Sequence, residues 1–83
     1  MALKERDMDL DENMLKELHE GCRARGCDLY SYLKERFPAS DTQQRLKYLA
    51  AVLNEFLEDY EYDKEDRIKE DGYLIVRFFP KDS

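Results

Sequence analysis

The hydrophobic period of this chain changes once, and that change limits the folds that the chain can adopt. Between residues 42 and 61, apolar side chains recur every three or four residues, which is the spacing of one face of a helix. Residues 73–79 (YLIVRFF) are instead rich in β-branched and aromatic side chains, which favour a strand. The sequence therefore predicts a helical part followed by a short β part.

The third of three predicted helices has the strongest pattern and covers residues 42–61. Asp41 and Gln44 have the spacing of a capping box, in which each side chain accepts a hydrogen bond from the other residue's backbone N–H group. We expect this helix to face the core through its apolar stripe. The residues of that stripe are Leu46, Leu49, Ala50, Leu53, Phe56, Leu57 and Tyr60.

Two shorter helices are predicted before it. The first covers residues 10–25, where Asp9 and Glu12 have the spacing of a capping box and Gly26 can supply the left-handed residue that ends a helix. Asp28 can cap a second helix of about three turns, which Pro38 ends because proline disfavours helical backbone at the residue before it.

A hairpin is predicted at the C-terminal end, with its turn at residues 70–72. A two-residue loop would place Ile68 opposite Ile75, whereas a three-residue loop ending in Gly72 would place Ile68 opposite Leu74. We prefer the second register, because it gathers the apolar residues of both strands on one face. It pairs Glu65 with Arg77 across the strands. Its outer face then carries Arg67, Lys69, Tyr73, Ile75 and Arg77.

The size of the chain allows one hydrophobic core, because half of 83 residues is below the usual size of an unaided domain. We expect a flexible leader at residues 1–8 and a single domain at residues 9–83. No apolar run approaches the roughly 18 residues that cross a membrane, and the first residues are charged. We therefore expect a cytoplasmic protein, or a nuclear one if the source is eukaryotic, with reduced cysteines.

The predicted order of elements is helix, helix, helix, strand, strand, which gives an α+β fold class and resembles the winged-helix superfold. More narrowly, residues 28–38 (DLYSYLKERFP), Arg45 with the helix behind it, and residues 71–79 (DGYLIVRFF) look like the latter part of a DEP-type winged helix. The hairpin arm that such domains insert between their first two helices is not in this sequence. The resemblance implies a binding module, and winged helices bind DNA, proteins and lipid surfaces alike.

Few residues suit catalysis or metal binding, so we expect neither an enzyme nor a cofactor. The chain has one histidine, no glycine-rich phosphate loop and no serine-hydrolase or zinc-protease motif. His19, Cys22 and Cys27 are zinc-ligand types, but their spacing is irregular and no fourth ligand is near. The acidic residues between 55 and 71 lack the calcium-loop pattern, so we interpret them as a solvated surface.

The partner is the least constrained property. The net charge of −6 is uneven, with five bases and ten acids in residues 49–83, and no continuous basic surface for nucleic acid is indicated. We predict a small acidic protein-binding adaptor or regulatory module. The alternative is a DNA-binding winged-helix transcriptional regulator, in which Arg45 also contacts DNA. No oligomeric state is indicated. The predicted partner-binding residues are Gln44, Lys47, Tyr48 and Ala51 on the third helix, with Arg67, Lys69 and Tyr73 on the hairpin.

Overall fold

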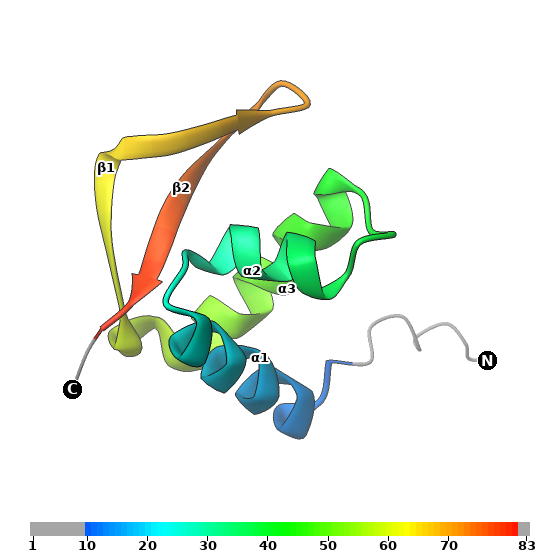
Figure 1. Cartoon of the computed structure of the whole chain (residues 1–83), viewed down its shortest axis with the longest axis vertical. Coiled ribbons are helices and arrows are strands. Elements are labelled where there is room, and N and C mark those ends of the chain that lie inside the picture. Colours follow the sequence, from blue (N-terminus) through cyan, green and yellow to red (C-terminus); the bar gives the residue numbers. More distant parts are fainter. Residues whose placement is uncertain (1–9, 82–83) are drawn as a thin grey trace.

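The fold was determined as a computed structural model that describes residues 10–81, and it consists of three helices followed by an antiparallel hairpin (Figure 1). This confirms the predicted α+β class, and the order of elements is compatible with a winged-helix-like layout. The expected leader at residues 1–8 lies outside the described residues. The elements are α1 (Glu12–Arg25), α2 (Leu29–Arg36), α3 (Thr42–Phe56), the 3-10 turn η2 (Leu57–Asp59), β1 (Tyr60–Glu70) and β2 (Tyr73–Pro80).

The ends of α1 follow from its capping residues. The carboxylate of Asp11 accepts a hydrogen bond from the backbone N–H of Met14 at 2.9 Å, so α1 begins at Glu12. The predicted capping box of Asp9 with Glu12 is therefore wrong, and Asp9 lies outside the described residues. Gly26 ends the helix with a φ of 72°, in the left-handed region that glycine adopts without strain, as predicted.

The caps of α2 and α3 agree with the prediction. Asp28 caps α2, and Asp41 and Gln44 form the complete capping box at the start of α3. The helix α3 ends at Phe56, five residues before the predicted end, because the chain tightens into η2 and then enters β1 at Tyr60. Of the described helices, none is long and apolar enough to cross a membrane.

The face of α3 that enters the core overlaps the predicted one only in part: Leu49 is buried as predicted, and Leu46, Leu53 and Phe56 pack partly buried against the core. Its buried residues are Thr42, Arg45, Leu49 and Val52, and Val52 has no exposed surface. Four residues that we predicted to be buried lie beside this face, and we describe them below. The difference arises because Arg45 is buried with hydrogen-bonding and ion-pair partners from α2 and the hairpin, which an apolar pattern does not reveal. A hydrogen-bonded and paired arginine can be buried.

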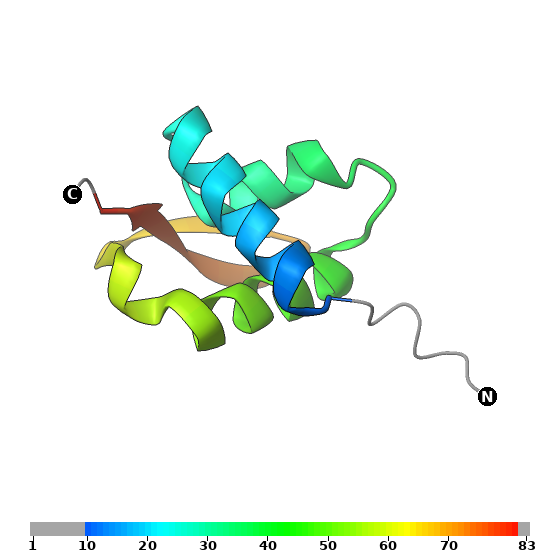
Figure 2. The same cartoon turned by 90° about the horizontal axis from the view of Figure 1, so that it is seen from below.

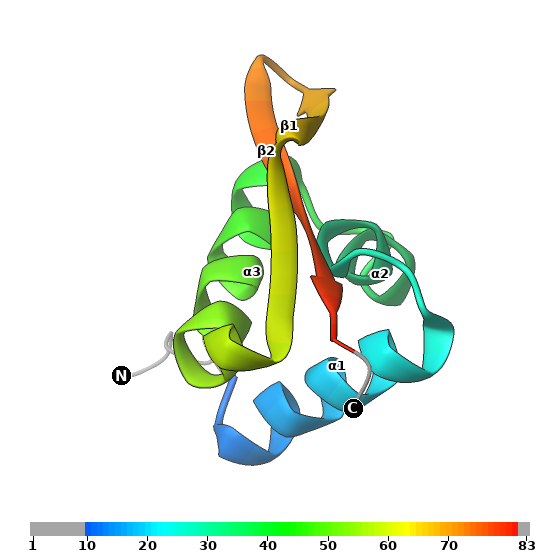
Figure 3. The ribbon, with the colours of Figure 1, turned by 90° about the vertical axis from the view of Figure 1, so that its left-hand side faces the viewer.

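The core lies where the three helices meet the hairpin (Figure 3). α1 and α2 contribute side chains that are fully or almost fully enclosed, and one residue from each strand closes the hairpin side. The buried apolar residues are Leu15, Leu18, Cys22, Leu29, Tyr30, Leu33, Leu49, Val52, Tyr60 and Ile75.

The hairpin adopts the register that we did not prefer. Ile68 pairs with Ile75 across a two-residue loop, so Ile75 is buried and Leu74 is 61% exposed. Asp71 and Gly72 both have positive φ, at 53° and 82°, as in the type I′ turns whose twist matches that of paired strands. The preferred three-residue loop and its outward placement of Ile75 are therefore wrong.

The middle of β1 is irregular and bends the hairpin over the helices (Figure 1). Tyr62 pairs with Phe78 and Arg67 with Val76, so four residues of β1 face one residue of β2, Arg77. Extra residues on one strand bend that strand and increase its twist. The bend brings the hairpin tip to the first turn of α3.

Arg77 points toward the helices, not to the outer face as predicted. Its guanidinium lies 3.3 Å from the carboxylate of Asp28, which is 1% exposed, and 3.2 Å from that of Asp66. The predicted cross-strand pair with Glu65 is wrong, because the irregularity of β1 shifts Asp66 into that position. Arg77 thus connects the cap of α2 to both strands.

Candidate functional site

Leu46, Ala50 and Leu53 follow one flank of α3 beside the core, and Leu57 comes next in the 3-10 turn η2. We call these four residues the α3 stripe. The three residues on α3 are spaced by four and three residues, as in the contact line of a coiled coil, whereas the non-helical backbone of Phe56 (φ −126°, ψ 28°) separates Leu57 from that line. Ala50 is exposed, Leu57 is 55% exposed, and Leu46 and Leu53 are half-buried against the edge of the core. Figures 2 and 3 show α3 at one side of the molecule, with no other described helix or strand over its outer side.

A polar margin runs beside the α3 stripe on the side of α3 that is farthest from the core. Its four residues are Gln43, Lys47, Asn54 and Glu58, and all are exposed. Lys47 lies in the first half of α3 and Glu58 lies in η2, beyond the end of the helix, so the charge along this margin changes sign. An apolar line with a polar margin can pack against another apolar surface while its edge stays in water.

Of the residues predicted for this site on α3, only Lys47 lies beside the stripe and is exposed. Gln44 and Tyr48 are half-buried, and they line a shallow depression of about 370 Å³ with Phe37 and Pro38. The Tyr48 ring packs against Phe37, with ring centroids 4.9 Å apart, so the tyrosine is not the free aromatic anchor that we expected. Ala51 is half-buried against the core.

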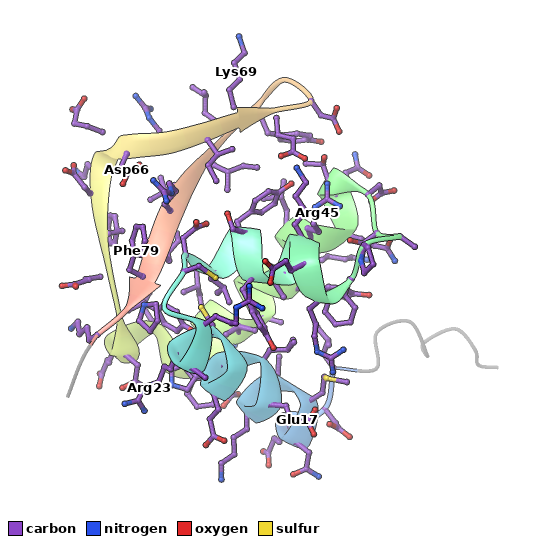
Figure 4. The ribbon with its side chains drawn as sticks, viewed as in Figure 1. Glu17, Arg23, Arg45, Asp66, Lys69 and Phe79 are labelled. Carbon is purple, nitrogen blue, oxygen red and sulfur yellow. The ribbon has the colours of Figure 1, made fainter. Side chains whose placement is uncertain are left out.

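The residues predicted on the hairpin lie at two places. Tyr73 is 38% exposed, and its hydroxyl accepts a hydrogen bond from Gln43 at 3.2 Å, so it lies against the first turn of α3. Arg67 and Lys69 are exposed on β1, and Lys69 points away from the helices at the top of Figure 4. The structure therefore brings Tyr73 to the start of α3 and leaves the two bases apart from the α3 stripe.

Arg45 is enclosed between α3, α2 and the hairpin tip (Figure 4), and sequence reasoning placed it outside. Its guanidinium donates to the Tyr30 hydroxyl at 3.0 Å, to the backbone oxygen of Ser40 and to the Glu70 carboxylate at 3.1 Å. The hydrogen bond to Tyr30 raises the pKa of Arg45, and the charge of Glu70 adds to that effect. These contacts hold the side chain inside the fold.

Further hydrogen bonds fix the hairpin tip to the helices beside Arg45. The Thr42 hydroxyl donates to the Asp71 carboxylate at 2.6 Å, and Lys34 lies 3.1 Å from Glu70. These contacts explain why the two-residue loop is adopted, since they hold both residues that precede Gly72. The hairpin tip is thus held against α2 and α3.

His19 is buried and makes side-chain contacts within the fold. Its Nδ1 shares a hydrogen bond of 2.9 Å with the Tyr60 hydroxyl, and its ring stacks on Phe56 with centroids 4.4 Å apart. Burial lowers the pKa of His19, although the carboxylate of Asp59 partly opposes that shift. The imidazole therefore packs as a neutral core group at pH 7.

Both cysteines are free thiols, with Cys22 buried and Cys27 half-buried. The Cys22 thiol donates to the backbone oxygen of Cys27 at 3.2 Å, and burial raises the pKa of Cys22 to about 12. Burial also raises the pKa of Cys27. Within residues 10–81, no three His, Cys, Asp or Glu side chains gather in a way that could hold a metal ion.

The described chain thus exposes apolar side chains at two places, along the α3 stripe and on the hairpin, where Tyr62, Tyr73 and Leu74 are exposed. Comparison with protein-family models, curated proteins and solved structures found no match. What the α3 stripe with its polar margin can do follows from its chemistry: it offers apolar contact and a few charges at its edge. It carries no paired nucleophile and base, since its residues are leucine, alanine, glutamine, asparagine, lysine and glutamate.

Proposed function

We propose that this chain is a protein-binding module, acting as a small adaptor or regulator, and that the α3 stripe is its binding surface. The observation that supports this is the exposure of Ala50 on α3 and of Leu57 just beyond its end, beside the half-buried Leu46 and Leu53. Isolated surface leucines are common, whereas an apolar line on a helix is typical of helix-to-helix contacts.

The gain from covering this stripe is modest but sufficient for a regulatory contact. Full burial of a leucine is worth about 1.5 to 3 kcal/mol, so covering the exposed half of Leu57 contributes on the order of 1 kcal/mol. The other stripe residues add similar or smaller amounts. A partner would therefore need its own apolar ridge, and the polar margin would fix its orientation.

The DNA-binding alternative has less support from the structure. Arg45 is held by internal contacts, which leaves Lys47, Arg67 and Lys69 as the exposed bases of that hypothesis. Glu58 lies on the same side of α3 and would repel phosphates. The stripe itself has no donors for base edges, and the affinity of DNA readers depends largely on phosphate contacts. A winged-helix-like layout is compatible with either partner.

A matched pair of variants tests the proposal. Ala50→Glu places a charge on the α3 stripe without opening a cavity, and Ala24→Glu makes the same change at an exposed position of α1. In extracts of source cells, proteins retained by wild type and by Ala24→Glu should be lost with Ala50→Glu, as quantified by mass spectrometry.

Two results would contradict the proposal. Equal retention of all proteins by the Ala50→Glu and Ala24→Glu baits would show that the stripe binds nothing. Duplex DNA binding that falls steeply with salt, and that Arg67→Ala and Lys69→Ala weaken, would favour the DNA-binding regulator instead.

A further inference from the structure

We propose that the hairpin tip carries a second docking surface, which binds an acidic amphipathic helix of another protein through two bases and two apolar side chains. We call Arg67, Lys69, Leu74 and Val76 the outer tip face. This inference goes beyond the proposed function, because it uses a different surface and does not depend on the α3 stripe. It gives the adaptor a separate contact for a second protein.

The register of the hairpin places these four side chains on one side of the sheet. Lys69 pairs with Leu74 and Arg67 pairs with Val76, and directly paired residues of an antiparallel hairpin point to the same face. Ile75, between the two residues of β2, points to the opposite face and is buried in the core. The outer tip face is therefore turned away from the core, and Lys69 points away from the helices in Figure 4.

The charged side chains of the tip are sorted by sign between its two sides. Glu70 lies 3.1 Å from both Arg45 and Lys34, and Asp71 accepts a hydrogen bond from Thr42 at 2.6 Å, so both acids are turned toward the helices. The two bases of the outer tip face are exposed, and neither forms an ion pair with another described residue. A chain with a net charge of −6 therefore presents a positively charged face at its hairpin tip.

Charge complementarity selects an acidic partner, and the apolar residues of the outer tip face select a protein segment. Carboxylates placed opposite the two bases would steer the partner and fix its orientation. Leu74 is 61% exposed, more than any other large apolar side chain of the described residues, and Val76 lies half-buried beside it. An apolar side chain of the partner can cover both, which removes apolar surface from water.

The arrangement of the outer tip face in two rows fits a helix better than an extended segment. The bases belong to β1 and the apolar residues to β2, so the two rows lie about 5 Å apart. Alternate residues of a strand are about 7 Å apart, and carboxylates four residues apart on a helix are separated by about 6 Å along its axis. A helix can present an acidic line beside an apolar line, whereas an extended segment turns one row toward a surface.

Single-stranded nucleic acid fits the outer tip face less well. Proteins that bind it combine bases with aromatic rings on which the nucleobases stack, and none of these four residues is aromatic. Two bases alone give few phosphate contacts. The observations therefore favour a protein partner.

The outer tip face is small, so the contact is expected to be weak. It covers two residues of each strand, and the exposed Asp63 and Glu65 would repel acids placed beyond Arg67. Such a contact is well below the size of a stable interface, and we expect a dissociation constant of about 0.1 to 1 mM.

Titration of the isotope-labelled full chain, followed by nuclear magnetic resonance, tests this inference. The probe is a synthetic alanine-based helical peptide with glutamates four residues apart beside a line of leucines, and the control peptide has lysines in place of the glutamates. The glutamate peptide should shift the amide signals of residues 67–69 and 74–76, with a dissociation constant that rises with salt. The lysine peptide should bind about tenfold more weakly or less.

Matched variants separate the charges from the apolar contact. Arg67→Glu with Lys69→Glu should reverse the preference between the two peptides, and Arg67→Gln with Lys69→Gln should remove it, which keeps the test available if the first variant does not fold. Leu74→Ser should weaken binding of the glutamate peptide about three- to tenfold, because it removes apolar contact. Leu57→Ser makes the same change at another exposed leucine and should have no effect. Circular dichroism checks that each variant keeps its fold.

Three outcomes would overturn the inference. The tip signals could stay unchanged up to about 5 mM glutamate peptide, the two peptides could bind equally, or an oligothymidylate could shift the tip signals at lower concentration than the glutamate peptide does. The last result would identify the ligand as nucleic acid. Ala50→Glu should leave binding of the glutamate peptide unchanged, so a failure at the α3 stripe and a failure at the outer tip face can be told apart.

Discussion

Arg45 joins α3 to α2 and to the hairpin tip, and its replacement by methionine tests this part of the fold. The guanidinium side chain is 8% exposed, and it donates to the Tyr30 hydroxyl, the Ser40 backbone and the Glu70 carboxylate. Methionine preserves much of the volume and the helix propensity, but it removes the charge and every donor. The variant therefore isolates the polar contacts from packing.

The loss of unfolding free energy expected for Arg45→Met can be estimated from these contacts. Removing one partner of a buried ion pair costs about 3 to 5 kcal/mol, because the other charge remains. The Glu70 carboxylate is 21% exposed and keeps Lys34 at 3.1 Å, which places the cost near the lower end, at about 3 kcal/mol. For a domain of this size, that is a decrease in melting temperature of roughly 12–24 °C.

Urea unfolding and thermal melts followed by circular dichroism measure this loss. Arg67→Met is the control, because Arg67 is exposed and its replacement should change stability by less than about 0.5 kcal/mol. A double-mutant cycle of Arg45→Met with Glu70→Gln should show coupling of about 1 kcal/mol or more. If Arg45→Met were as stable as Arg67→Met, Arg45 would not hold the hairpin, and a role in DNA contact would be open again.

Three more predictions follow from buried groups. Val52→Ala should lower the free energy of unfolding by about 2 kcal/mol and Leu53→Ala by only about 1 kcal/mol, because Val52 is fully enclosed and Leu53 is half-buried. Urea unfolding measures both values. A larger loss for Leu53→Ala than for Val52→Ala would support the helix face predicted from the sequence. Because the folded-state pKa of His19 lies below 6.5, its stabilising effect is complete above pH 6.5 and is lost as the pH falls through the lower folded value. The wild type should therefore lose more stability than His19→Gln between about pH 7.5 and about pH 5.5, and equal losses would refute this. Cys22, whose pKa is raised to about 12, should react with iodoacetamide at about pH 8 only after unfolding, and rapid labelling of the folded chain would contradict its burial.

Local signals in the sequence were enough to predict the number, order and most boundaries of the elements. The caps Asp28 and Asp41, and the stop at Gly26, act within three or four residues of their own position. Such short-range hydrogen bonds are visible in a sequence. The end of α3 was misplaced because residues 57–60 continue the helical spacing, although the chain turns there to enter β1.

The errors concern choices that depend on distant residues. Ile68 pairs with Ile75 because the turn at Asp71 and Gly72 is anchored to α3, and the strand pattern alone favoured the other register. Arg45 was assigned to the surface because its partner Glu70 lies 25 residues away. In both cases a tertiary contact outweighed the hydrophobic pattern.

The candidate site was predicted only in part, because the burial of the third helix also depends on distant residues. The third helix was the right element, and Lys47 lies at the margin of the surface that we propose. The α3 stripe was missed because its leucines were assigned to the core, which left Tyr48 as the apparent anchor. The change from basic to acidic residues between Lys47 and Glu58 was visible in the sequence.

The most direct test of the central claim is site-specific photo-crosslinking in source cells. A benzophenone amino acid replaces Asn54, beside the α3 stripe, or Arg67, on the exposed side of the hairpin. The proposal predicts protein adducts from position 54 that Ala50→Glu abolishes, whereas that variant should leave any protein adducts from position 67 unchanged. Nucleic-acid adducts from position 67, with no protein adduct from position 54, would contradict it.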